Sequence, residues 1–194
     1  AILGLNAATS TYKAGKESGR VVMTGSHPEE NISGDRLEFM AAMVRYAMDG
    51  NGQPTLKGEL VPGETRVMDK NTIDNDPAHT AVGDRQYHHF VVRIPKGTKR
   101  AEITLEGIPG KDNFDLSLLA KKGDFALHNT THLQDVSLGC NKTLVLERPQ
   151  AGQWFISVFC DTTVETSYGK YGTEYTGRRE VLNGVPYTLR VSFK

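Results

Sequence analysis

The sequence predicts a mainly β chain, in which an antiparallel, jelly-roll-like β-sandwich follows a small α/β fragment. Two observations carry this prediction. The one clear amphipathic helix pattern falls within the first 50 residues, and beyond it apolar and polar residues alternate in short runs bounded by Gly, Pro, Asn or Asp. Alternation with a period of two is typical of half-buried strands, and many such strands without helices between them favour an antiparallel sandwich over a βαβ array.

The first 50 residues indicate strand, connection, strand and helix. We expect strands at Ala1–Leu5 and Arg20–Thr24, with a polar connection between them. A helix is expected over Asp35–Asp49, because apolar residues recur at helical spacing and Asp35 with Glu38 forms a capping-box pattern. These elements bury too little surface to fold alone. Residues 1–52 are therefore expected to be the C-terminal end of a larger α/β domain.

Residues 53–83 are rich in Gly, Pro, Asn and Asp, which indicates a linker that leads into a first edge strand. Residues 84–194 are expected to form the sandwich itself. Its strands are expected at Tyr87–Ile94, Arg100–Glu106, Phe114–Leu119, Thr143–Glu147, Trp154–Phe159 and Tyr187–Phe193.

Charge and hydropathy narrow the range of partners. The 194 residues include 23 basic and 23 acidic side chains, so the formal net charge is zero. A neutral chain has no long-range field that attracts nucleic acid or an anionic membrane, and no apolar run reaches the ~20 residues that span a bilayer. We expect neither a nucleic-acid partner nor a membrane span. The chain begins like a processed or truncated product, because it lacks an initial Met and the basic region of a signal peptide.

A candidate catalytic site lies in the sequence Gly-Ser-His27-Pro28-Glu29, after an expected strand and before the expected helix. Open α/β sheets place their chemistry at the carboxyl ends of strands, and a His oriented by a carboxylate forms two parts of a relay that activates a nucleophile. The chain has no Gly-x-Cys-x-Gly or Gly-x-Ser-x-Gly sequence to supply that nucleophile. Alternatively, Pro28 ends the strand, and the Glu29 carboxylate interacts favourably with the positive, N-terminal end of the following helix.

Residues 19–29, followed by a helix, resemble the last strand and the His-Pro-Glu turn of the class I glutamine amidotransferase-like fold, in the form similar to the N-terminal part of biotin protein ligases. The resemblance implies a flavodoxin-like domain with a Cys-His-Glu triad, in which His27 is the general base and Glu29 orients it. The nucleophile of such an amidohydrolase or peptidase would lie upstream or on another chain. An inherited scaffold without activity is the favoured alternative.

Four blocks of the second half, Gly83–Phe90, Gly110–Leu118, Ala151–Val158 and Tyr187–Val191, have an order and spacing that resemble the bacterial pre-peptidase C-terminal domain. The resemblance extends over about residues 55–194. That family is a jelly-roll-like β-sandwich appended to secreted peptidases and other exported enzymes. It implies a non-catalytic role in binding, targeting or stabilisation, and a secreted or periplasmic location.

Relatives of this domain sometimes bind calcium, and Asp112, Asn113 and Asp115 offer the oxygen ligands that calcium prefers. Residues 74–76, an Asp-Asn-Asp sequence, offer others. Alternatively, these side chains form turns by bonding nearby backbone groups, and we favour this interpretation. The six histidines show no zinc signature, so calcium is the one candidate cofactor.

The two cysteines are expected to lie near each other. A hairpin between Thr143–Glu147 and Trp154–Phe159 would place Cys140 opposite Cys160. Directly opposed residues have Cα atoms ~4.5–5.5 Å apart, which suits a disulfide. The bridge would agree with an oxidising, exported location, and the alternative is a pair of buried thiols.

A candidate binding segment contains Tyr168, Tyr171 and Tyr175 among glycines and threonines, with Lys170 and two arginines nearby. The segment is longer than a hairpin connection needs. Exposed tyrosines among small residues form adaptable contact surfaces for a glycan or a protein. Alternatively, the segment is a hairpin extension that covers an edge of the sandwich.

Overall fold

The computed structural model describes residues 9–13, 20–24, 40, 42–44, 47, 54–71, 74 and 76–194. The chain divides into two compact units, Ala1–Pro54 and Thr55–Lys194. Within the described parts of both units, no helix is long and apolar enough to cross a membrane.

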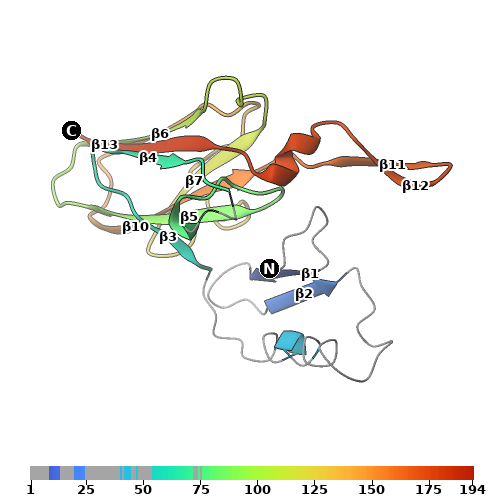
Figure 1. Ribbon diagram of the computed structural model, residues 1–194. Coiled ribbons are helices and arrows are strands. Elements are labelled where there is room, and N and C mark those ends of the chain that lie inside the picture. The colour runs from blue at the N-terminus through green and yellow to red at the C-terminus, as the bar shows by residue number, and fades with distance from the viewer. Residues whose placement is uncertain are drawn as a thin grey trace. The chain divides into compact units, whose positions relative to one another are not determined.

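In the first unit, β1 (Thr9–Lys13) pairs antiparallel with β2 (Arg20–Thr24) (Figure 1). The prediction of a strand at Arg20–Thr24 is confirmed. The residues of β1 were expected to be a connection, but their β-branched and aromatic side chains favour an extended strand. Met40, three residues at 42–44 and Ala47 are helical, inside the expected helix. The expected strand at residues 1–5 lies outside the described residues.

The second unit contains the predicted antiparallel β-sandwich (Figure 1). One sheet has the order β3-β5-β10-β7-β8 and the other has the order β4-β13-β6-β9. Every pairing between these strands is antiparallel except that of β3 with β5. The bounds are β3 (Leu56–Glu59), β4 (Thr65–Met68), β5 (Tyr87–Ile94), β6 (Arg100–Gly107), β7 (Leu116–Lys122), β8 (Gln134–Asp135), β9 (Lys142–Glu147), β10 (Gly152–Cys160) and β13 (Tyr187–Phe193).

Alternate residues of the long strands form the core between the two sheets. Phe90 from β5 and Ile156 from β10 face Ile103 from β6 and Leu189 from β13 in this core, and all four are essentially buried. Burial of each such side chain stabilises the fold by about 1.5–3 kcal/mol. The period of two in the sequence therefore becomes the inner face of the sandwich.

The five-stranded sheet is also buried on its outer face, where the connection between β7 and β8 covers it. Phe125 from this connection lies 4.9 Å from the His89 ring and 4.8 Å from the Phe155 ring, between ring centroids. Leu119, on the outward side of β7, is fully buried. This cover explains why Leu116–Ala120 is buried at every position, since a strand covered on both faces needs no polar side.

Residues 53–83, expected to be a linker and edge strand, contribute the two edge strands β3 and β4 and the short 3-10 helix η2 (Pro77–His79). The Arg66 guanidinium connects these elements, because its Nη2 donates to the carbonyl oxygens of Lys57 at 2.8 Å and Ala78 at 2.9 Å. An isolated parallel β-bridge, formed by the backbones of Lys70 and Thr80, adds a further connection. One side of the sandwich is thereby closed by polar contacts.

The predicted hairpin between β9 and β10 is wrong, and with it the register that places Cys140 opposite Cys160. β9 pairs with β6, whereas β10 lies between β5 and β7 in the other sheet. The connection crosses between the sheets after Arg148, whose φ is 47°. Both thiols are free and buried, so the structure lacks the predicted disulfide. The Cys140 thiol donates to the Phe114 carbonyl at 3.1 Å instead.

Candidate functional site

The predicted catalytic pair His27 and Glu29 lies outside the described residues. Its role as general base and orienter stays a prediction. The candidate sites that the structure describes all belong to the second unit.

The tyrosine segment forms a separate two-stranded hairpin, β11 (Glu165–Gly169) and β12 (Gly172–Thr176), which extends from the sandwich as an arm (Figure 1). Tyr168 is 93% exposed and Tyr171 is 90% exposed, so almost the full surface of both side chains is available for contact. Lys170 places its ammonium 5.4 Å from the centre of the Tyr171 ring. Tyr175 lies on the return strand and is 36% exposed.

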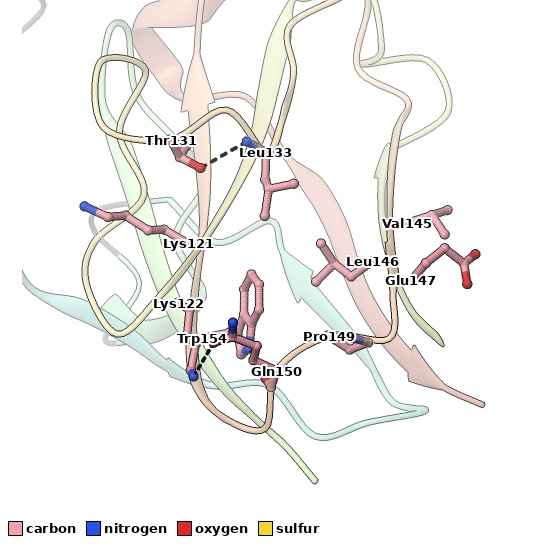
Figure 2. A pocket seen from close by; sticks show the side chains of 10 residues that line it. All are labelled: Lys121, Lys122, Thr131, Leu133, Val145, Leu146, Glu147, Pro149, Gln150 and Trp154. Carbon is pink, nitrogen blue, oxygen red and sulfur yellow. Dashed lines mark hydrogen bonds between the residues drawn. The ribbon is translucent and has the colours of Figure 1, made fainter. Parts of the chain in front are cut away.

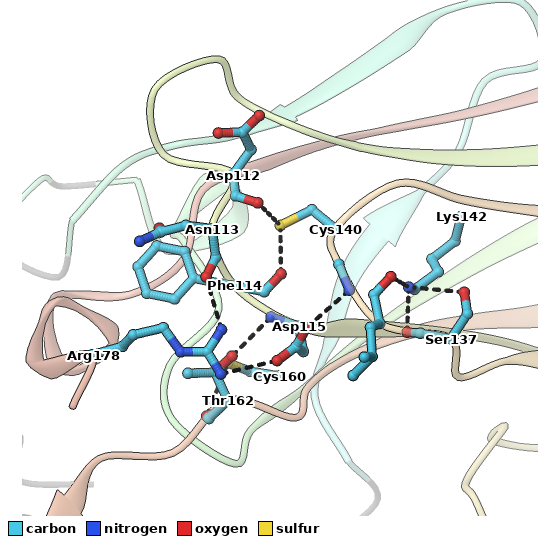
Figure 3. A network of polar contacts seen from close by, with 12 residues as sticks. Asp112, Asn113, Phe114, Asp115, Ser137, Cys140, Lys142, Cys160, Thr162 and Arg178 are labelled. Atoms are coloured by element: carbon cyan, nitrogen blue, oxygen red, sulfur yellow. Dashed lines mark hydrogen bonds and ion pairs between the residues drawn. The ribbon is translucent and has the colours of Figure 1, made fainter.

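Carboxylates of the sandwich hold both ends of this arm. On the entering side, Asp84 Oδ2 accepts from the Thr163 hydroxyl at 3.2 Å. On the returning side, Arg178 donates to Asp115 Oδ2 at 2.9 Å and to the Asn113 carbonyl at 2.8 Å (Figure 3). The base of the arm is therefore fixed on the sandwich, while its tip is exposed.

Asp115 is the centre of the network at the base of the arm (Figure 3). The Gly139 amide donates to its Oδ1 at 2.8 Å. This bond and the Arg178 guanidinium lower the pKa of Asp115 below its ordinary value, against the opposing effect of burial. Both carboxylate oxygens of Asp115 thus have protein partners.

Of the calcium ligands proposed from the sequence, Asp74, Asp76 and Asp115 have side-chain partners within the protein. Asp76 pairs with His79 at 2.8 Å, and the Asn71 amide donates to Asp74 at 2.9 Å. Asp112 and Asn113 are exposed beside the base of the arm. Among the described residues, no group of three or more His, Cys, Asp or Glu side chains could hold a metal ion. Calcium binding by Asp112, Asn113 and Asp115 stays a prediction.

The adjacent histidines of β5 face opposite sides of the sheet, as expected from their place on a strand. His88 Nδ1 lies 2.9 Å from the Tyr187 hydroxyl in the core, and His89 Nδ1 lies 2.8 Å from the Ser157 hydroxyl on the outer face. Burial lowers the pKa of His88 to about 3, with a further contribution from Lys57. Burial lowers the pKa of His89 to about 4. Both imidazoles are therefore neutral at pH 7.

A pocket of about 400 Å³ opens between β7 and β9 (Figure 2). Trp154, Leu146 and Leu133 supply apolar surface, and Leu146 and Leu133 point into the pocket from opposite walls. Lys122 donates to Gln150 Oε1 at 2.8 Å on the polar side of the same pocket. Its volume lies within the range of about 300–1,000 Å³ that is typical of ligand sites.

Sequence reasoning missed this pocket and the network that anchors the arm. Residues of the pocket come from three separate stretches of the chain, near positions 121, 133 and 146 to 154, so no linear motif marks it. The available signal was Trp154, which is the single tryptophan of the chain and lies near the start of β10.

Comparison with known proteins gives limited similarity. No family model matches the chain. The cytosolic serine hydroxymethyltransferase of Candida glabrata is 29% identical over 100 residues, which are 50% of this chain and 20% of that enzyme. The chain thus spans about a fifth of the length of this curated relative. A solved structure of the pre-peptidase C-terminal domain of collagenase from Bacillus anthracis has a TM-score of 0.34 and 8% identity, covering 73% of this chain and 100% of that domain.

Proposed function

We propose that residues 55–194 form an exported, non-catalytic binding domain that attaches to a glycan or protein surface through the tyrosine arm, residues 165–176. The observation that carries the proposal is the exposure of Tyr168 and Tyr171 at the end of a hairpin held at both ends. Exposed tyrosines supply a large contact area at low cost in conformational entropy. An arm with a fixed base loses less freedom on binding, so more of the contact energy appears as affinity.

The carboxylates at the base of the arm and the two buried histidines of β5 have structural roles, which supports binding over catalysis. Asp115 is occupied by Gly139 and Arg178, and Asp84 holds the entering strand. His88 and His89 are buried in their neutral form. The sandwich therefore serves as a rigid support for an exposed loop, which is a common division of roles in binding domains.

Replacing both exposed tyrosines should weaken retention on a solid surface without unfolding the domain. In the variant Tyr168→Ser with Tyr171→Ser, we expect binding to fall by at least about 30-fold, because the loss of even one central aromatic contact costs about 2 kcal/mol. Retention is measured on chitin, cellulose, peptidoglycan and immobilised denatured protein, which separates a glycan from a protein ligand.

The matched control is Val61→Ser, which removes an apolar side chain that is 52% exposed and lies outside the arm. It should bind as the unmodified chain does. Equal retention of the double tyrosine variant, or no retention of the unmodified chain on any of the four surfaces, would overturn the proposal.

For the first unit, we propose the end of an amidotransferase-like domain, supported by the sequence around His27 and Glu29 and by the helix pattern that follows. If this site is active in the complete protein, His27→Ala should reduce turnover by at least about a hundredfold, because a general base typically contributes 10²–10⁴-fold. The assay is hydrolysis of glutamine and of peptide amides, with His132→Ala as the control. An unchanged rate would leave the first unit as an inert scaffold.

A further inference from the structure

The two open sides of the sandwich differ in how their strand edges are covered. On the side of β3 and β4, Arg66 and η2 close the gap between the sheets. On the opposite side, β8 has two residues, which pair with Leu118 and Leu119 of β7. The end of β9 at Thr143 is covered, since its amide lies 3.4 Å from Asp135 Oδ2. The rest of β9 borders the pocket.

The direction of the β9 backbone groups follows from the contacts of two backbone amides at its ends. The Thr143 amide points away from β6, toward Asp135, while the Arg148 amide donates to Lys99 on the β6 side at 2.7 Å. Backbone groups of successive strand residues point alternately to the two sides. The N–H and C=O groups of Val145 and Glu147 therefore point away from β6. Among the strands that the structure describes, β9 pairs with β6 alone.

The pocket lies directly beside these outward-pointing backbone groups (Figure 2). Leu146 points from β9 into the pocket, and Trp154 forms the surface below it. A strand added next to β9 would run about 4.8 Å away and would direct every second side chain toward this apolar surface. An exposed strand edge beside an apolar pocket is the arrangement that binds extended peptides by strand addition.

We propose that the β9 edge and the Trp154 pocket form a peptide-binding groove. Its ligand is an extended segment of another protein, which pairs with Val145 and Glu147 and places one large apolar or aromatic side chain in the pocket. Backbone pairing supplies affinity and the pocket supplies selectivity, because only inward-facing side chains meet Trp154 and Leu146. This groove is distinct from the tyrosine arm, and its role does not depend on that of the arm.

The test uses a short, capped peptide of alternating threonine and valine with one central phenylalanine. The peptide is added to the full chain, and the signals of residues 55–194 are followed by two-dimensional NMR. We expect shifts of the amide signals of Val145 and Glu147 and of the single indole N–H signal of Trp154. The two amides should also become protected from hydrogen exchange. A peptide in which phenylalanine is replaced by serine should bind about tenfold more weakly, because its side chain leaves the pocket unfilled.

Val145→Pro removes the outward-pointing amide and leaves the ladder to β6 intact, since proline is tolerated where an edge-strand amide faces away from the sheet. We expect this variant to bind the peptide at least about tenfold more weakly than the unmodified chain. The matched control Val145→Thr, which keeps the amide, should bind the peptide normally. A peptide N-methylated on its backbone gives the same comparison without altering the protein. No shift at millimolar peptide, or equal binding by the N-methylated peptide, would overturn the proposal.

Discussion

Lowering the pH from 7 to 4 should reduce the free energy of unfolding of the sandwich by roughly 6 kcal/mol through His88 and His89. Their ordinary pKa is 6.5, and in the folded chain it falls to about 3 for His88 and about 4 for His89. As the pH falls below 6.5, the unfolded chain binds protons that the folded chain cannot accept. The contribution of the two histidines to stability is therefore present above pH 6.5 and is lost progressively as the pH falls to their folded pKa values.

The loss is measured by urea unfolding at a series of pH values. The variant with His88→Gln and His89→Gln should show a much flatter profile, because glutamine retains a hydrogen bond to Tyr187 or Ser157 and does not titrate. His132→Gln, at an exposed position of the loop before β8, should keep the slope of the unmodified chain. An unchanged slope in the double variant would contradict the buried neutral state of the two imidazoles.

Replacing Lys142 with methionine should lower the free energy of unfolding by about 3 kcal/mol. This side chain is 2% exposed, and its ammonium donates to the carbonyls of Ser137 at 2.5 Å and Leu138 at 3.2 Å (Figure 3). Methionine fills a similar volume but removes the charged donor that connects these two carbonyls. The ammonium holds the bend between β8 and β9 together with Asp135, which accepts from the Ser137 amide at 3.2 Å.

Urea unfolding at pH 7 checks this prediction. Lys121→Met is the matched control, because Lys121 is part-exposed and pairs with Asp124 at 3.2 Å, and we expect its loss to be below about 1 kcal/mol. If both lysine variants lose the same small amount, the buried ammonium contributes no special stability.

Strands with clear alternation and turn residues at both ends were predictable from sequence. Tyr87–Ile94 and Tyr187–Phe193 were predicted to the residue. The pairing of the two strands within residues 143–160 was not predictable, because a local sequence looks alike whether two successive strands pair with each other or lie in different sheets. The strand pairings β6–β9 and β5–β10 are long-range, and tertiary packing decides between the two arrangements.

The tyrosines of the candidate site could be predicted from the sequence, but the contacts that hold the base of the arm could not. Tyrosines among small residues marked the arm. The carboxylates that hold its base come from positions far away in the chain, with Asp115 63 residues from Arg178 and Asp84 79 residues from Thr163. Single-sequence periodicity carries no information on such pairs.

The exposure of the arm has a consequence for how such a domain can diversify. The side chains of Tyr168, Lys170 and Tyr171 at the end of the arm are exposed, whereas the contacts that hold its base are made by Thr163 and Arg178. Exchanges at the end of the arm leave the packed interior unchanged, and surface exchanges usually alter stability by less than about 0.5 kcal/mol. Sequence drift or deliberate redesign of the tip can thus change what the domain recognises while the scaffold keeps its stability.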